Sequence, residues 1–303
     1  MDYETLIDAE TWDFIADTEA YYPPDTVDQD VTTQRRIYDT MCRAFFRGYP
    51  EGVTARDERI GTVPIRTYTA AAAARATVVY FHGGGFVVGG LDSHDDVCAE
   101  ICHRTGHRVV SVDYRLAPEH KHPAMFDDAL GGAEHVLKQY SGPVLLCGDS
   151  AGGNLAAAVA HRLRTEPRIA GQVLIYPGLG GDMNAGSYLR HAEAPMLRRD
   201  ELEFYRHVRL SGDEPVGDPT YAPLHDTDFT DLPATLIITA ECDPLSDDGR
   251  AYRDAIRRAG GRADWINEPG LVHGYLRARS TVARARASFD RIVAALADMG
   301  NAG

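Results

Sequence analysis

The chain has no long apolar run, no basic leader at its start and no excess of positive charge. No window reaches the roughly 18 apolar residues that a membrane helix needs, and the chain starts with the acidic stretch Met1-Asp2-Tyr3-Glu4-Thr5. Its 31 Lys and Arg are outnumbered by 45 Asp and Glu, for a formal net charge of -14. Such a field repels phosphates, so we expect no nucleic-acid partner. The lack of a basic leader and of a long apolar run predicts no membrane insertion and a cytoplasmic protein.

Cysteine is also scarce, and its five residues do not suggest a disulfide framework. An odd number of scattered cysteines is typical of a reducing compartment. Cys98 and Cys102 lie one helical turn apart near His94 and His103, which raises a metal site as one interpretation. No second ligand pair at zinc-like spacing accompanies them. We therefore interpret the two cysteines as small core residues of one helix, and we expect no metal.

Apolar strands alternate with helical stretches from residue 51 onward, a pattern typical of βαβ units and a mostly parallel sheet. A length of 303 residues favours one α/β domain with insertions. The predicted strands are Arg59–Thr62, Val63–Thr69, Thr77–Phe81, Arg108–Tyr114, Val144–Cys147, Gly171–Tyr176, Ala234–Ala240 and Ala263–Asn267. The predicted helices are Ser93–Arg104, Ala124–Lys138, Asn154–Arg164, Asp248–Ala259 and Ser280–Met299.

Two segments depart from this alternation. Residues 1–50 show loose helical periodicity, and we expect two helices around the break Tyr21-Tyr22-Pro23-Pro24. Residues 179–221 interrupt the alternation with an amphipathic helix near Asp200–Arg209 and are predicted to be an insertion. The N-terminal helices could form a lid over a site built later in the chain, or a plain structural extension.

Gly148-Asp149-Ser150-Ala151-Gly152 is the stretch that most clearly predicts chemistry. It follows the strand Val144–Cys147 and precedes a helix. Glycines two residues on either side of Ser150 allow a sharp turn that holds the hydroxyl clear of the backbone. The free N–H groups of the following helix can face a developing oxyanion. Ser150 is therefore predicted to be a nucleophile.

A serine nucleophile needs a base, and the base needs an acid that orients it. Ligands gather at the carboxyl ends of parallel strands, where Asp243 and His273 each follow a predicted strand. The order Ser, Asp, His is the one that this strand-turn-helix context requires. Asp247 and Asp248 are nearby alternatives for the acid, but we interpret Asp248 as the N-cap of the next helix.

The run His82-Gly83-Gly84-Gly85 follows the strand Thr77–Phe81. Consecutive glycines let backbone amides approach a ligand closely, as a tetrahedral acyl intermediate requires. We predict oxyanion donors at the amides of Gly84, Gly85 and Ala151. His82, with Gly83 and Asp149, is expected to support the loop rather than to transfer protons.

These motifs together resemble one family. The segments His82–Gly85, Gly148–Gly153, Asp243–Leu245 and His273-Gly274, with the block Asp113–Glu119, are similar to those of the hormone-sensitive-lipase-like α/β-hydrolases. Gly89–Asp95 and the N-terminal Tyr-Pro-Pro region resemble bacterial acetyl esterases. The resemblance implies an α/β-hydrolase fold: a mostly parallel sheet of about eight strands, flanked by helices, with a helical cap. The cap would comprise residues 1–50 and an insertion at about 179–221, and residues 51–303 would be the catalytic domain.

The resemblance also implies a serine carboxylesterase that acts on short-chain, acetyl-like esters through an acyl-enzyme. Such an enzyme needs no cofactor, and its partner is a small ester. An amidase or deacylase could use the same three groups, and some relatives bind hormone-like ligands without catalysis. The binding proteins of this kind have lost the histidine, whereas His273 is present here. Either a monomer or a homodimer is compatible with the sequence.

Overall fold

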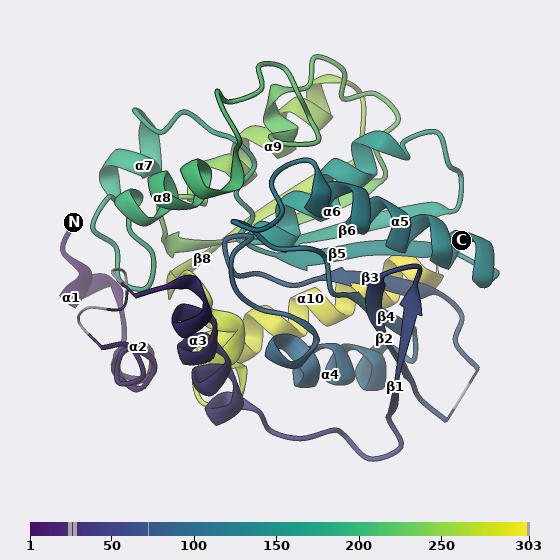
Figure 1. Cartoon of the computed structure of the whole chain (residues 1–303), viewed down its shortest axis with the longest axis horizontal. Coiled ribbons are helices and arrows are strands. Elements are labelled where there is room, and N and C mark those ends of the chain that lie inside the picture. The colour runs from purple at the N-terminus through teal and green to yellow at the C-terminus, as the bar shows by residue number, and fades with distance from the viewer. Residues whose placement is uncertain (24–25, 27–28, 72, 302–303) are drawn as a thin grey trace.

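An eight-stranded sheet runs through the middle of the protein (Figure 1). The computed structural model describes residues 1–23, 26, 29–71 and 73–301. The strand order is β1-β2-β4-β3-β5-β6-β7-β8, antiparallel at β1/β2 and β2/β4 and parallel elsewhere. The strands are β1 (Thr54–Ile60), β2 (Val63–Thr69), β3 (Thr77–Phe81), β4 (Arg108–Val112), β5 (Val144–Asp149), β6 (Ile169–Ile175), β7 (Ala234–Cys242) and β8 (Ala263–Val272). The predicted α/β-hydrolase fold with a mostly parallel eight-stranded sheet is confirmed.

The central strands carry apolar residues without alternation because helices cover both faces of the sheet. Every residue of β3 and β5 is buried. The helices α5 (Ala124–Gln139), α6 (Ala151–Arg162) and α9 (Ser246–Arg258) lie on one face (Figure 1). The helices α4 (Asp95–Thr105) and α10 (Ala283–Asn301) lie on the other. The helices thus cover both faces of the sheet but not its end where the parallel strands finish, and the remaining segments lie at that end.

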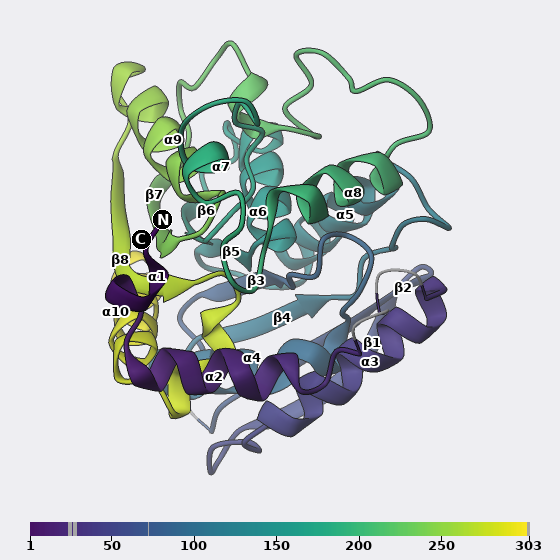
Figure 2. The same cartoon turned by 90° about the vertical axis from the view of Figure 1, so that its left-hand side faces the viewer.

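The described part of the N-terminal segment contains three α-helices where the sequence predicted two helices: α1 (Tyr3–Leu6), α2 (Ala9–Glu19) and α3 (Val31–Phe45). Pro24, the second proline of the predicted break, lies outside the described residues. Residues 179–221, the predicted insertion, contain α7 (Gly186–Arg190) and α8 (Arg199–Arg209). Figures 1 and 2 show α2 and α3 on one side of the same end of the molecule and α7 and α8 on the other. The described residues also form the short 3₁₀ helices η2 (Leu91–His94), η3 (Pro223–His225) and η4 (Tyr275–Ser280).

Two predicted boundaries near the motifs are wrong. The helix after Ser150 begins at Ala151, not at Asn154, because close packing of Gly152 and Gly153 overrides the weak helix propensity of glycine. The last strand was predicted to end at Asn267 but continues to Val272, although it contains a proline and a glycine, which are typical of a turn. A register shift against β7 accommodates them.

The predicted N-cap role of Asp248 is also wrong, because α9 begins at Ser246 and its cap position is Leu245. The Asp248 carboxylate is buried and accepts hydrogen bonds from the Leu179 N–H at 2.7 Å and the Tyr188 hydroxyl at 3.0 Å. Burial raises the pKa of Asp248 to about 6. Asp248 therefore ties the start of residues 179–221 to α9.

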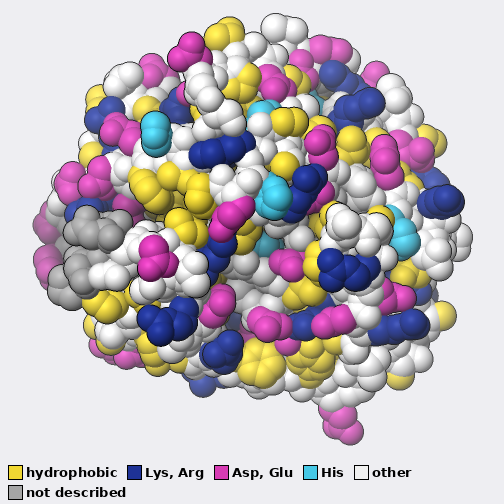
Figure 3. Space-filling view, viewed as in Figure 1, with side chains coloured by type: hydrophobic (Ala, Val, Ile, Leu, Met, Phe, Trp, Pro, Cys, Tyr) yellow, Lys and Arg dark blue, Asp and Glu magenta, His cyan; other side chains and the backbone are white. Residues whose placement is uncertain are grey.

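The described helices include none with the length and apolar character that a bilayer span requires. Figure 3 shows acidic and basic side chains interspersed over one face of the molecule. All five cysteines are unpaired and buried. Cys98 and Cys102 pack inward from α4, as the core interpretation predicted, and no cluster of three or more potential metal ligands occurs within the described part of the chain.

Candidate active site

The turn between β5 and α6 holds Ser150 in an unusual backbone conformation. Its φ of 53° and ψ of -117° lie in a region that residues with a side chain rarely adopt. The Ser150 N–H donates to the Ile175 carbonyl at 2.9 Å, which fixes the turn to the neighbouring strand β6. A Cβ on Gly152 would lie 1.9 Å from the Phe81 carbonyl oxygen, so no other residue fits there. The glycine spacing is therefore a packing requirement of the turn.

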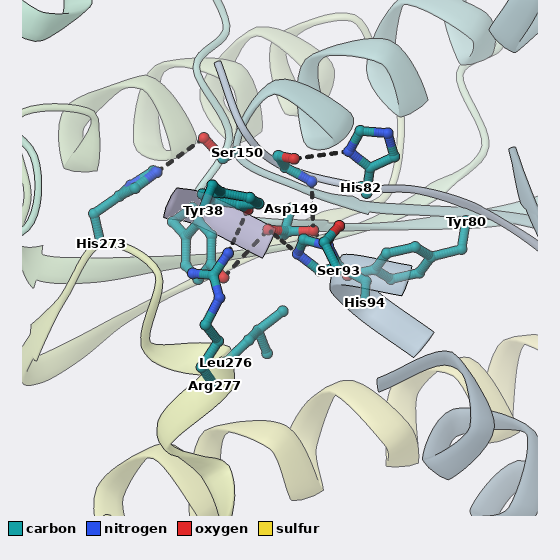
Figure 4. A network of polar contacts seen from close by, with 12 residues as sticks. Tyr38, Tyr80, His82, Ser93, His94, Asp149, Ser150, His273, Leu276 and Arg277 are labelled. Atoms are coloured by element: carbon teal, nitrogen blue, oxygen red, sulfur yellow. Dashed lines mark hydrogen bonds and ion pairs between the residues drawn. The ribbon is translucent and has the colours of Figure 1, made fainter. Parts of the chain in front are cut away.

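Three residues from distant parts of the chain form a line of hydrogen bonds. The Ser150 Oγ lies 2.8 Å from Nε2 of His273, and Nδ1 of His273 lies 2.7 Å from Oδ2 of Asp243 (Figure 4 shows the first contact). Asp243 is completely buried and its other oxygen accepts the Leu245 N–H at 2.8 Å. With the carboxylate as acceptor, His273 donates its Nδ1–H and presents Nε2 to the serine hydroxyl. The structure thus brings together the nucleophile, base and acid that the sequence predicts.

The glycine run after β3 passes beside this line. Gly84 and Gly85 have φ values of +125° and +60°, which favour glycine. A Cβ on Gly84 would lie 2.2 Å from the Val88 carbonyl oxygen, and one on Gly85 would lie 2.5 Å from the Tyr205 ring. Ala151 is the first residue of α6, so its N–H belongs to the helix end that has no intrahelical acceptor. Gly84, Gly85 and Ala151 all line the same cavity as Ser150.

Asp149, directly before the serine, accepts four hydrogen bonds below the turn (Figure 4). Its Oδ1 accepts the Tyr80 hydroxyl at 2.8 Å and the Gly83 N–H at 3.0 Å. Its Oδ2 lies 3.2 Å from Nε2 of His94 and 3.4 Å from the Tyr176 hydroxyl. Burial favours the protonated acid, but the charge and hydrogen bond of His94 and the Tyr80 hydroxyl outweigh it, so the pKa of Asp149 is lowered. Asp149 joins the serine turn to the start of the glycine loop.

His82 stabilises the same loop from inside the protein. Its Nδ1 donates to the Gly83 carbonyl at 2.8 Å, and its ring stacks on Tyr114 with centroids 4.3 Å apart. The Tyr114 hydroxyl donates to the His82 carbonyl at 2.6 Å. Burial and the charge of His94 lower the pKa of His82 to about 4, so its imidazole is neutral at pH 7. His82 lies outside the line of hydrogen bonds from Ser150 to Asp243.

A cavity of about 920 Å³ opens above Ser150 and His273. Its lining comes from the loops at the end of the sheet and from residues 1–50 and 179–221. Trp12, Tyr22 and Tyr38 belong to the N-terminal segment. Leu202 and Tyr205 belong to α8 of the insertion. The reactive groups therefore face a chamber whose walls are largely built by residues 1–50 and 179–221.

Sequence reasoning missed several residues of the site. Tyr176 follows β6 with a φ of 34°, and its ring centroid lies 4.7 Å from that of His273. Its position at the carboxyl end of a parallel strand was a usable signal. His94, which we considered only as a metal ligand, instead contacts Asp149. Arg277, four residues after His273, gave no signal in the sequence and lines the cavity.

Comparisons with known proteins agree with this geometry. A family model described as the alpha/beta hydrolase fold matches residues 78–277. A relative named Carboxylesterase NlhH, from Mycobacterium tuberculosis, is 39% identical over 233 residues, which are 72% of each chain. An ethyl acetate hydrolase from Pseudomonas putida is 33% identical over 257 residues, 80% of each chain. The solved structure of an esterase from the bacterial hormone-sensitive lipase family matches with a TM-score of 0.88 and 26% identity, covering 96% of this chain and 98% of that one.

Proposed function

Because this chain belongs to the hormone-sensitive-lipase-like family of α/β-hydrolases, we propose that it is a serine carboxylesterase that cleaves short-chain, acetyl-like esters through an acyl-enzyme. The general activity is that of a carboxylic ester hydrolase. One observation carries the mechanism: the hydrogen bonds of 2.8 and 2.7 Å that link Ser150 to His273 and His273 to Asp243 at the base of the cavity.

In the first half of the reaction, Oγ of Ser150 attacks the ester carbonyl carbon while Nε2 of His273 takes the serine proton. Asp243 holds the imidazole in the tautomer that can accept this proton and stabilises the imidazolium. The tetrahedral intermediate collapses, the bond to the alkoxy group breaks, and His273 gives the proton to the leaving alcohol. Water then attacks the acyl group on Ser150 with the same proton transfers, releasing the acid.

The negative charge of each tetrahedral intermediate falls on the former carbonyl oxygen. We assign its stabilisation to the N–H groups of Gly84, Gly85 and Ala151, three residues that line the same cavity as Ser150. Removal of one such donor typically costs about 2.7–4 kcal/mol of transition-state stabilisation. Asp149, His82 and Gly83 support this loop from below and touch no reacting atom in the proposal.

We further propose that residues 1–50 and about 179–221 form a cap over the catalytic domain, residues 51–303. Their joint contribution to the cavity wall supports this division. The preference for short acyl groups is supported by the relative named an ethyl acetate hydrolase. Nitrophenyl esters of two to ten acyl carbons test it, because a cap that closes over a small acyl group lowers kcat/KM for longer ones. A preference for eight carbons or more would overturn the short-chain assignment.

Amide hydrolysis could use the same groups, so matched ester and amide substrates are compared in the same assay. A higher kcat/KM for the amide would make the protein an amidase. The absence of turnover with either class would favour a ligand-binding protein. The hydrogen bond between His273 and Ser150 favours an enzyme instead. Five unpaired, buried cysteines support a cytoplasmic location.

The nucleophile assignment is tested with Ser150→Ala and nitrophenyl acetate. Turnover should fall to the background rate, and a phosphonate probe should label the wild type on Ser150 and leave the variant unlabelled. Ser141→Ala, at an exposed position before β5, is the matched control and should keep full activity. Retained turnover in Ser150→Ala, with a purity check against contaminating esterase, would refute the mechanism.

A further inference from the structure

Arg277 occupies a place that the mechanism above leaves unexplained. It belongs to η4, which follows His273, and its guanidinium points toward Tyr38 and the Asp149 carboxylate (Figure 4). Its Nη2 donates to the Tyr38 hydroxyl, and the guanidinium carbon lies 5.0 Å from the centre of the Tyr38 ring. Its Nε is buried with no hydrogen-bond partner among the described residues. Arg277 is partly buried, and a charge that is partly withdrawn from water needs compensation from its surroundings.

Asp149 is the anion whose charge Arg277 can compensate. The positive charge of Arg277 is one of the causes that lower the pKa of Asp149, after those of His94 and Tyr80. No direct ion pair between the two is formed in the described structure, so the interaction acts over a longer distance, between the partly buried guanidinium of Arg277 and the buried carboxylate of Asp149. Water and salt screen an interaction between partly buried and buried charges less than one between charges at the surface.

Asp149 contacts both the glycine loop and the tyrosine that packs against His273. One of its oxygens holds the Gly83 N–H, at the start of the proposed oxyanion loop. The other accepts the Tyr176 hydroxyl, and the Tyr176 ring packs against His273. A shift of the Asp149 carboxylate would therefore move the oxyanion donors and the surface on which the base rests.

Tyr38 connects the same network to the N-terminal segment. It lies on α3 and is 8% exposed. Its hydroxyl accepts a hydrogen bond from Nη2 of Arg277, so α3 helps to determine where the guanidinium lies. A residue of the proposed cap thus helps to hold a charge below the serine turn.

We propose that Arg277 is a positioning residue for ester hydrolysis: held by Tyr38 of α3, its guanidinium stabilises the Asp149 carboxylate, which in turn fixes the oxyanion loop and the Tyr176 platform under His273. This inference rests on the proposed function. It adds that the rate of the chemical step depends on a contact made by the N-terminal segment, the hydrogen bond between Arg277 and Tyr38.

The test compares Arg277→Met, Arg277→Lys and Tyr38→Phe by steady-state kinetics on nitrophenyl acetate. Arg277→Met should lower kcat about tenfold with KM within twofold, because a displacement smaller than 1 Å costs less than the roughly 100-fold expected for a full 1 Å. Arg277→Lys, which keeps the charge, should recover at least half of the loss on a logarithmic scale. Tyr38→Phe removes a single oxygen and should lower kcat about threefold, by less than Arg277→Met, because the charge remains.

Arg279→Met is the matched control, because Arg279 is buried in the same short helix but pairs with Asp96 and Glu100 on α4. It should lower the melting temperature and leave kcat within twofold. The rate of phosphonate labelling provides a second readout, since the phosphoryl oxygen occupies the oxyanion site. It should fall in Arg277→Met in parallel with kcat.

Three results would overturn the proposal. A rise in KM with unchanged kcat in Arg277→Met would make Arg277 a substrate contact. An equal loss of kcat in Arg279→Met would show a general effect of destabilisation. Unchanged kcat and labelling rate in Tyr38→Phe would remove α3 from the network, even if Arg277→Met does not fold. If the proposed function itself is wrong, the Ser150→Ala variant will remain active, and this result separates that failure from a failure of the Arg277 proposal.

Discussion

Replacement of Asp149 by asparagine tests the bracing of the serine turn most directly. All four partners of this carboxylate approach as hydrogen-bond donors. An asparagine amide offers one oxygen and one NH₂ group, so two of the four donor groups must then face the NH₂ group, which is itself a donor. The shorter contacts are those of Tyr80 and Gly83 to Oδ1, at 2.8 and 3.0 Å. We therefore expect the amide oxygen to remain there and the NH₂ group to face His94 and Tyr176.

The magnitude follows from the two lost contacts. A hydrogen bond to a charged group contributes about 1.5–3 kcal/mol, and His94 can recover part of the loss by presenting an unprotonated Nε2. Asp149→Asn should therefore lower the free energy of unfolding by about 3 kcal/mol. The kcat should fall as well, because the Tyr176 platform loses its acceptor. Urea unfolding followed by circular dichroism at pH 7, with kcat on nitrophenyl acetate, measures both.

Asp113→Asn is the matched control, since Asp113 is a partly buried carboxylate near the same loop. Burial raises the pKa of Asp113 to about 6, so its ionisation opposes folding once the pH exceeds its unfolded value near 4. At pH 7 this substitution should leave stability unchanged or increase it. A loss below about 1 kcal/mol in Asp149→Asn, or equal losses in the two variants, would refute the bracing role of Asp149.

Two further predictions concern the same elements. In the folded protein the pKa of His82 is about 4, whereas in the unfolded chain its imidazole takes up a proton near pH 6.5. The stability that comes from keeping His82 neutral is therefore complete above pH 6.5, and about 3 kcal/mol of it is lost as the pH falls to 4. Urea unfolding at several pH values should give a shallower dependence for His82→Gln, and identical slopes would contradict the assignment. Gly152→Ala should abolish soluble expression, because its Cβ would lie 1.9 Å from the Phe81 oxygen. Gly131→Ala in α5, which meets nothing within 4 Å, should be stabilising by about 0.5–1 kcal/mol. Soluble, active Gly152→Ala would show that the turn can relax.

Much of the fold and the reactive line could be predicted from the sequence, because their signals are local. The strand before Ser150, the glycines around it and the glycine run after β3 each depend on neighbouring residues. The order of Ser150, Asp243 and His273 then follows from the rule that parallel strands finish at one edge of the sheet. Where local signals conflicted with packing, the predictions failed: the glycines after Ser150 are helical, and β8 continues through a proline and a glycine.

The surroundings of the site were decided by tertiary structure alone. Asp248 has the sequence context of a helix cap, yet its buried carboxylate accepts a hydrogen bond from the Leu179 N–H, at the start of residues 179–221. Tyr38 and Arg277 lie 239 positions apart and meet below the serine turn. No periodicity or spacing in a single sequence encodes such a contact, because it depends on how α3 and η4 pack against the sheet. Sequence chemistry thus determined which groups can react, and long-range packing decided what holds them in place.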